Sequence, residues 1–185
     1  GVHVHGAQAA GEATQQRWRI NQAADDAAGM VISDSLKARI RSFSVAERNT
    51  SNAVSMTNTA EGGLNQISGI IQRMRELAVQ SANGDLTSTD RGFIDTEFQQ
   101  LKDEIDRLSE TTQFNTQELL AGTAVSIDFQ VGINTTSFDT ISVTFGGVTT
   151  SSLGMSGISV GGTVATNATS AIDTLDAALT SISTR

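Results

Sequence analysis

The sequence contains no cysteine, no proline and no tyrosine, and aromatic residues make up only 4% of it. The lack of cysteine excludes disulfide bonds, thiolate metal sites and cysteine nucleophiles. Because proline is missing, no residue forces a break in a long helix. With so few aromatic residues, a core has to be built from Ala, Ile, Leu, Val and Met, which favours slim helix packing over a bulky globule.

Histidine occurs only at His3 and His5, so the body of the chain cannot carry a histidine triad, a zinc-protease helix or a histidine–carboxylate iron site. These two could contact a metal together, but no third ligand lies near them, and we expect no metal or other cofactor. Residues 1–16 show no apolar period, no initiator methionine and no signal peptide. We expect this stretch to be a frayed extension, a cloning remnant or the stump of a truncated element.

Acidic residues outnumber basic ones by 20 to 12, which gives a formal net charge of −8. This balance disfavours nucleic acid and anionic membranes as partners. No run of about 18 apolar residues is present, so we expect no membrane insertion. The length of 185 residues suits one domain, or one domain with extensions.

A long helix is predicted from about residue 27 to residue 82. Apolar residues there recur at spacings of three and four, the heptad pattern of packed helices. Asp25 or Asp26 would cap its start. About 55 residues would form a rod on the order of 80 Å long. The apolar seam consists of Ile32, Leu36, Ile40, Phe43, Ala53, Met56, Ala60, Gly63, Ile67, Ile70, Met74 and Leu77.

The rest of the chain predicts two more helices and a β-hairpin. Residues 83–90 form a turn, and a second helix runs from about 91 to 111, antiparallel to the end of the first. Alternating apolar residues at 125–131 and 141–145 predict two strands within a hairpin and loop region at about 123–166. A third helix begins near Asn167, a good N-cap, and covers about 167–185. We therefore expect a mainly α fold with a small β part, shaped as an elongated rod.

No sequence motif predicts catalysis. The acidic cluster Asp103, Glu104 and Asp106 has no partner of another chemical type, and we interpret it as a solvated helix face. By exclusion, the chain is a structural or interaction protein, and no enzyme activity is predicted.

Five strings identify a family through their order and spacing. Residues 19–29 read RINQAADDAAG, and residues 46–67 read AERNTSNAVSMTNTAEGGLNQI. QRMRELAVQSANG follows at 72–84, DEIDRLSETTQFNTQELLAG at 103–122 and AIDTLDAALTSIS at 171–183. Together they resemble bacterial flagellin, the subunit of the flagellar filament. The resemblance covers about 19–122 and 153–185.

The resemblance implies a flagellin rod domain at 19–185, with residues 1–18 as a non-matching extension or stump. Flagellins carry further terminal helices, which the resemblance assigns to the core of the filament, so we expect this chain to be a fragment. The region at 123–166 is too short for a large outer domain. Its lack of histidine excludes the zinc-peptidase insert of some family members.

For function, the resemblance implies a secreted structural protein that packs with other flagellin subunits in the extracellular flagellum and serves motility. In many species the same rod surface is a ligand of Toll-like receptor 5, an innate immune sensor of vertebrates. The resemblance carries six residues over to this contact: Arg73, Leu77 and Glu97 as main contacts, and Gln72, Glu76 and Gln80 in support.

The residues alone also allow plainer interpretations. Arg73 and Glu76 are spaced as an ordinary i,i+3 surface ion pair, and Leu77 also falls on the apolar seam. Arg75 and Arg91 could add contacts. Within the family, the alternative is a hook–filament junction protein, which the intact strings RINQAADDAAG and QRMRELAVQ argue against. An adhesive or sugar-binding module is a further alternative, weakened by a β region without Tyr or Trp to stack on a sugar.

Overall fold

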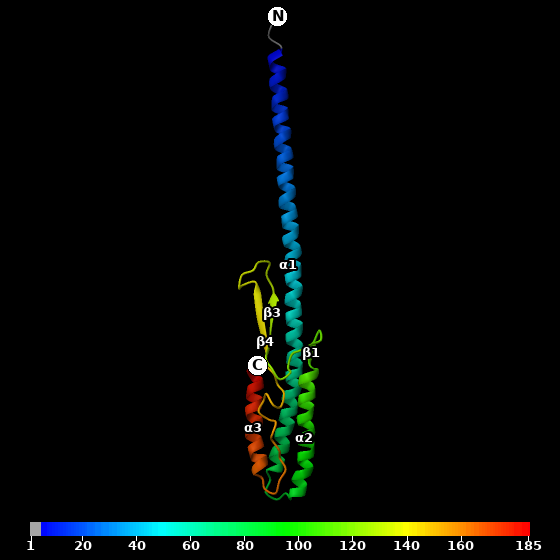
Figure 1. Cartoon of the computed structure of the whole chain (residues 1–185), viewed down its shortest axis with the longest axis vertical. Helices are drawn as coiled ribbons and strands as arrows, with labels where there is room; N and C mark the ends of the chain where they lie inside the picture. Colours follow the sequence, from blue (N-terminus) through cyan, green and yellow to red (C-terminus); the bar gives the residue numbers. More distant parts are fainter. Residues whose placement is uncertain (1–4) are drawn as a thin grey trace.

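The computed structural model describes the backbone of residues 5–185 and the side chains of residues 23–185. One long helix runs the length of the molecule, and two shorter helices pack beside its C-terminal part (Figure 1). This arrangement confirms the predicted mainly α rod with a small β part. The elements are α1 (His5–Ser81), α2 (Ser88–Thr111), β1 (Gln113–Phe114), β2 (Gln117–Glu118), β3 (Val125–Gln130), β4 (Thr140–Phe145) and α3 (Thr166–Ser183).

α1 begins earlier than predicted. We expected a start near residue 27, a cap at Asp25 or Asp26 and a frayed stretch before it, and for residues 5–26 this is wrong. The helix already runs from His5, so Asp25 and Asp26 lie inside it and are exposed. The segment contains no proline and is rich in Ala and Gln, so nothing stops the helix there. The pair His3 and His5 lies outside the described side chains.

α2 and α3 lie within three residues of their predicted ranges. Thr87 caps α2: its hydroxyl accepts from the backbone NH of Asp90 at 3.2 Å, and the Asp90 carboxylate accepts from the backbone NH of Thr87 at 3.0 Å. Asn167 does not cap α3, contrary to our prediction. Its side chain instead donates to the carbonyl of Gly161 at 2.9 Å, because the preceding loop folds back over the helix start.

The core lies where α1 packs against both α2 and α3. The heptad prediction is correct for this part of α1, since Met56, Ala60, Ile67, Met74 and Leu77 are buried. α2 and α3 contribute their own apolar faces to the same cluster, together with residues of the loops. These are Phe98, Ile105, Leu119, Leu120, Val148, Met155, Val160, Ala171, Leu175 and Ala178.

The β part consists of two separate antiparallel hairpins. β3 pairs with β4 in the register Val125↔Phe145 to Gln130↔Thr140, as the alternating pattern predicted. This hairpin lies beside the middle of α1, where the Asn49 side chain donates to the carbonyl of Gln130 at 2.9 Å. The sequence did not predict the short β1–β2 hairpin.

Hydrogen bonds of the buried Lys102 and the half-buried Asp95 fix the loop after β4 to α2. Lys102 donates to the carbonyls of Ser156 at 2.7 Å and Ile158 at 3.3 Å. The Asp95 carboxylate accepts from the backbone NH of Val160 at 2.8 Å and from the Ser159 hydroxyl at 2.9 Å. These bonds let a loop rich in Gly, Ser and Thr bury apolar residues with its backbone groups paired.

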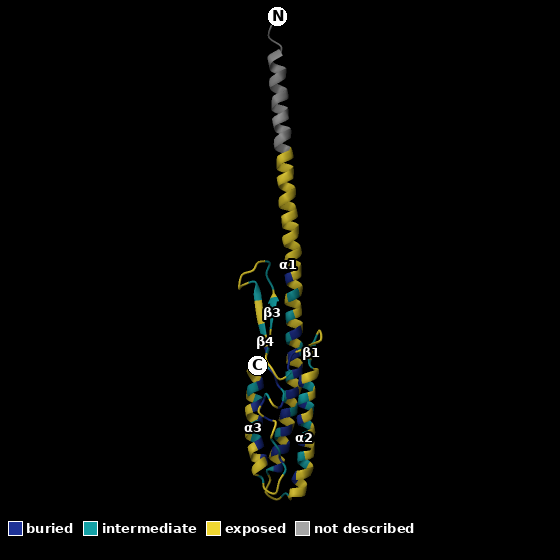
Figure 2. Cartoon of the chain, in the orientation of Figure 1, coloured by how far each residue is buried: buried dark blue, intermediate teal, exposed yellow. Residues whose placement is uncertain are grey.

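The N-terminal part of α1 projects beyond the bundle as a single helix. The described side chains from residue 23 to residue 45 are all exposed (Figure 2). They include the first part of the predicted seam, Ile32, Leu36, Ile40 and Phe43, which we call the α1 stripe. Within the described residues, no helix is long and apolar enough to cross a membrane.

Candidate recognition surface

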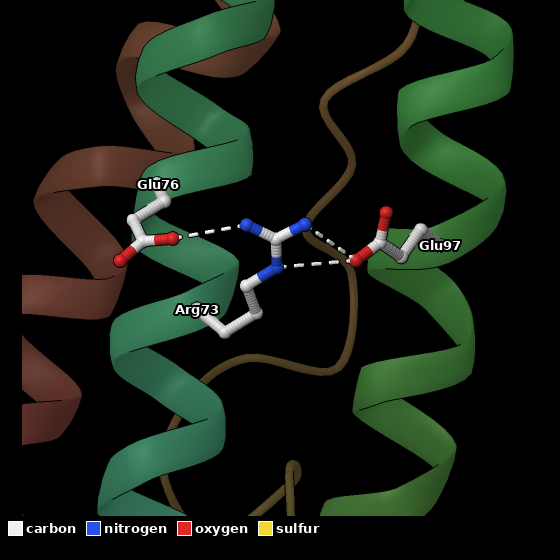
Figure 3. A network of polar contacts seen from close by, with 3 residues as sticks. All are labelled: Arg73, Glu76 and Glu97. Atoms are coloured by element: carbon white, nitrogen blue, oxygen red, sulfur yellow. Dashed lines mark hydrogen bonds and ion pairs between the residues drawn. The ribbon is translucent and has the colours of Figure 1, made fainter.

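Arg73 links α1 to α2 on the surface of the rod (Figure 3). Its Nε and Nη2 atoms donate to Oε1 of Glu97, at 3.2 Å and 3.0 Å. Its Nη1 atom donates to Oε2 of Glu76, one turn further along α1, at 3.0 Å. The structure therefore brings together three residues that the sequence analysis singled out, although Glu97 is 24 positions away from Arg73.

This network is charged and open to solvent. The hydrogen bond to Glu76, followed by that to Glu97, raises the pKa of Arg73 above its ordinary value, so the guanidinium keeps its charge. The side chains of Arg73 and Glu97 are 50% and 47% exposed. At that exposure an ion pair stabilises the fold only weakly, and its groups stay available to a partner. An exposed arginine bound by two carboxylates therefore contributes little to stability and can still contact a partner.

Leu77 does not belong to the exposed surface. Its side chain is 2% exposed and lies in the core cluster between the helices. We expected Leu77 to be a main contact, but a buried side chain cannot contact a partner directly. The other interpretation, that Leu77 belongs to the apolar seam of α1, agrees with its burial. Leu77 can only support the surface from below, by fixing the turn of α1 that carries Arg73 and Glu76.

Gln72, Glu76 and Gln80 lie together as predicted, on the exposed face of α1. With Arg75 and Val79 they line a shallow groove of about 470 Å³. Val79 is exposed and adds an apolar side chain to the lining of this groove, a contribution that the sequence analysis did not predict.

The two further arginines behave differently from each other. Arg75 forms an ion pair with Asp176 of α3 at 2.7 Å, which joins α1 to α3 at the edge of the groove. No sequence signal connects these two, which lie 101 positions apart. Arg91, the other residue considered as an added contact, is buried and cannot reach a partner on the surface.

The surface offers contacts but no reactive group arranged for chemistry. Among the described residues, no group of three or more His, Asp or Glu side chains could hold a metal ion. The charged groups at this surface form ion pairs, Arg73 with Glu76 and Glu97 and Arg75 with Asp176, in open surroundings. Such a surface fits a protein partner.

Comparison with known proteins identifies the family. Residues 5–125 match the family described as the bacterial flagellin N-terminal helical region. The chain belongs to the bacterial flagellin family. The matched range begins at residue 5 and so includes most of residues 1–18, which the resemblance left out. The boundary between an extension at 1–18 and a rod domain at 19–185 stays a prediction.

Known flagellins are similar over much of this chain. A flagellin of Halalkalibacterium halodurans is 42% identical over 99% of this chain and 66% of its own length. The flagellar filament 41 kDa core protein of Borreliella burgdorferi is 47% identical over 59% of this chain and 32% of its own length. The crystal structure of Bacillus cereus flagellin superposes with a TM-score of 0.60 at 32% identity, over 74% of this chain and 77% of that one. The chain thus spans two thirds or less of the length of these curated relatives.

Proposed function

We propose that this protein is a structural subunit of the extracellular flagellar filament, that residues 19–185 form its rod domain, and that its partners are other flagellin subunits. Membership of the flagellin family carries this proposal. The long helix supported on two sides by α2 and α3 is a form suited to side-by-side packing. No cofactor or catalytic step is needed for such a role.

Immuno-electron microscopy of the source bacterium tests this proposal. An antibody raised against this chain should label flagella along their whole length. Labelling confined to the point where filament meets hook would contradict the filament role and favour the hook–filament junction protein. An antibody preabsorbed with the chain provides the control.

We further propose that the surface around Arg73 is recognised by Toll-like receptor 5. The observation that carries this proposal is the bridge from Arg73 to Glu97, because it joins the two main contacts implied by the family into one exposed charged cluster. Gln72, Glu76 and Gln80 extend the cluster along α1. Leu77 is left out because it is buried.

A reporter-cell assay for the receptor tests this second proposal. We expect the chain to activate the receptor, and a variant with Arg73→Ala and Glu97→Ala to lose at least about tenfold in potency, since interface arginines typically contribute more than about 1.4 kcal/mol. The matched control is Glu104→Ala with Arg107→Ala, which removes another exposed Arg–Glu pair, 2.6 Å apart, outside the proposed contact. Equal potency of both double variants would contradict the assignment.

A further inference from the structure

The turn between α1 and α2 places an asparagine in surroundings that suit a chemical modification. Asn83 is the one asparagine of this chain that glycine follows. Both Asn83 and Gly84 are exposed, and a Cβ at Gly84 would meet nothing within 4 Å. Within the described part of the chain the backbone NH of Gly84 makes no hydrogen bond, so it is available for reaction.

The Gly84 amide can attack the side chain of the residue before it. Its nitrogen loses the proton to hydroxide and forms a bond to Cγ of Asn83, and the side-chain nitrogen leaves as ammonia with a proton taken from water. The product is a succinimide ring, which contains the Gly84 nitrogen and the main-chain carbonyl carbon of Asn83. A β-carbon on the attacking residue would hinder this step, and glycine has none.

The main-chain carbonyl of Asn83 accepts hydrogen bonds from two donors. Nη2 of Arg91 donates to its oxygen at 2.8 Å, and the backbone NH of Leu86 donates to it at 3.5 Å. Arg91 is fixed in place, since it is only 2% exposed and also donates to the carbonyls of Ser81 and Thr163. A fixed cationic donor polarises this carbonyl and stabilises negative charge that develops on its oxygen.

We propose that Asn83 is a site of spontaneous deamidation, at which Arg91 directs the product towards isoaspartate. Water can open the succinimide at either carbonyl. Attack at the main-chain carbonyl carbon breaks its bond to the Gly84 nitrogen, which takes a proton. The chain then continues through the former side chain, and the main-chain carbonyl becomes a free carboxylate, which is isoaspartate. Attack at the side-chain carbonyl carbon breaks the other bond to nitrogen and gives ordinary aspartate.

Arg91 favours the route to isoaspartate in two ways. It stabilises the oxyanion that forms when water adds to the main-chain carbonyl. In the product, the new carboxylate stands where the Asn83 carbonyl now accepts from Arg91. The acceptors of this buried guanidinium are carbonyls throughout the described residues, and a hydrogen bond to a carboxylate is stronger.

The modification changes the charge and the backbone beside the surface proposed for recognition. Deamidation adds a negative charge to a chain whose formal net charge is −8. Because the backbone NH of Asn83 donates to the carbonyl of Gln80 at 3.3 Å, the site lies next to the last residue of that surface. Isoaspartate also lengthens the main chain of the turn by a carbon atom. None of this chemistry depends on the filament or on the receptor.

Incubation of the full chain in mildly alkaline buffer, followed by peptide mass spectrometry, tests the site. We expect the peptide with Asn83 to gain the mass that exchange of NH2 for OH adds, and to do so faster as the pH rises. Asn65 is an internal control, since it is also exposed but lies inside α1, where the next amide donates along the helix. An unreacted Asn83, or equal reaction at Asn65, would overturn the proposal.

Gly84→Ala should slow the reaction severalfold, because the added β-carbon hinders the attacking nitrogen. The fold should tolerate this variant, since the Cβ has room and the φ of Gly84 lies outside the left-handed region. Circular dichroism of the variant checks that tolerance. A rate equal to that of the parent would count against attack by the Gly84 amide.

The ratio of the two products tests the role of Arg91. Chromatography against synthetic standards separates isoaspartate peptides from aspartate peptides of equal mass. We expect a larger isoaspartate share from the folded chain than from the same chain unfolded in urea, where Arg91 has no fixed place. Equal shares would overturn the role of Arg91, and this comparison needs no variant.

Arg91→Met, shown to be folded by circular dichroism, should lower the isoaspartate share to that of the unfolded chain. The matched control is Arg107→Met, which removes an exposed arginine of the same helix and should leave the share unchanged. The same loss of isoaspartate in both variants would contradict the assignment to Arg91.

Discussion

Arg91 brings a positive charge into the interior of the rod, where its partners are carbonyl groups. It donates to the carbonyls of Ser81 at 2.9 Å, Asn83 at 2.8 Å and Thr163 at 3.3 Å, and is only 2% exposed. Two of these carbonyls belong to the C-terminal end of α1 and the residues that follow. A cation there pairs with the negative end of the helix dipole and satisfies carbonyls that the helix itself leaves open.

We expect Arg91→Met to lower the free energy of unfolding by about 2–3 kcal/mol, because buried carbonyls lose their donor. Urea unfolding followed by circular dichroism would measure this. The control is Arg39→Met in the projecting part of α1, where the side chain is exposed and the change should stay within about 0.5 kcal/mol. Equal effects would show that Arg91 does not fasten the end of α1.

Asp95 should make the stability of the rod depend on pH. Burial opposes the charge of Asp95, but hydrogen bonds from the Val160 backbone NH, Gln99 and Ser159 outweigh it and lower the pKa of this carboxyl below its ordinary value. A lowered pKa stabilises the folded state at pH values above the pKa of Asp in the unfolded chain, about 3.9. This stabilisation disappears as the pH falls through the lower pKa of the folded state.

The substitution Asp95→Asn should therefore reduce stability at neutral pH and flatten its fall in acid below about pH 4. Urea midpoints of parent and variant, taken at a series of pH values, would measure this. The two curves should converge in acid, where the parent carboxylate is protonated. Curves that stay parallel throughout would contradict the assigned role of the charge.

At the scale of elements, two neighbouring glycines in α1 have opposite surroundings. A Cβ at Gly63 would lie 2.8 Å from Oγ1 of Thr112 and 2.9 Å from Cδ1 of Leu120, whereas a Cβ at Gly62 would meet nothing within 4 Å. Gly63 thus lets the chain after α2 approach α1 closely, as a glycine on the seam can. Gly62 brings only the entropic disadvantage of glycine in a helix.

Alanine substitutions should separate the two sites. We expect Gly63→Ala to destabilise the protein by about 1–3 kcal/mol through crowding, and Gly62→Ala to stabilise it by up to about 1 kcal/mol. Thermal unfolding of both variants beside the parent would show shifts of opposite sign. A shift of the same sign for both would mean that the packing around Gly63 can relax.

The elements were predictable where a periodic pattern and local contacts decide them. The seam from Met56 to Leu77 is buried as its spacing indicated, and the β3–β4 register follows the alternation of its strands. The start of α1 was not predictable from capping residues. Asp25 and Asp26 are of a residue type that often precedes a helix, but here the helix has already begun before them.

The short β1–β2 hairpin depends on two adjacent residues with positive φ, Asn115 at 50° and Thr116 at 64°. This is the backbone of a tight hairpin turn, in which glycine usually takes the second place. Because threonine stands at position 116 in place of glycine, the sequence gives no signal for such a turn, and the hairpin was not predicted.

The candidate site was predictable in part. The contact from Arg73 to Glu76 follows from helix geometry, whereas that from Arg73 to Glu97 needs the two helices docked in one register. Only the family resemblance connected them in the sequence. For Leu77 the resemblance misled, because a residue can match a contact position of the family and still face the core.

For the whole molecule, the contrast between bundle and projecting helix should appear in its dynamics. The described side chains of residues 23–45 are all exposed, and a helix with little tertiary packing is only marginally stable in water. The part from Met56 to Ser81 is packed on α2 and α3.

Hydrogen exchange should therefore proceed much faster at residues 23–45 than at residues 56–81. Mass spectrometry of peptides from the two regions would measure the difference. Similar protection in both regions would contradict the expected contrast.

The single-helix projection also has a mechanical consequence. The resistance of a rod to bending rises steeply with the width of its cross-section, and α1 passes from a part packed on α2 and α3 to a part that projects as a single helix (Figure 1). A transverse force on the projecting part would therefore bend it and leave the bundle straight. The three-helix part should therefore be stiff and the projecting helix more flexible, and the stiffness changes beside the β3–β4 hairpin.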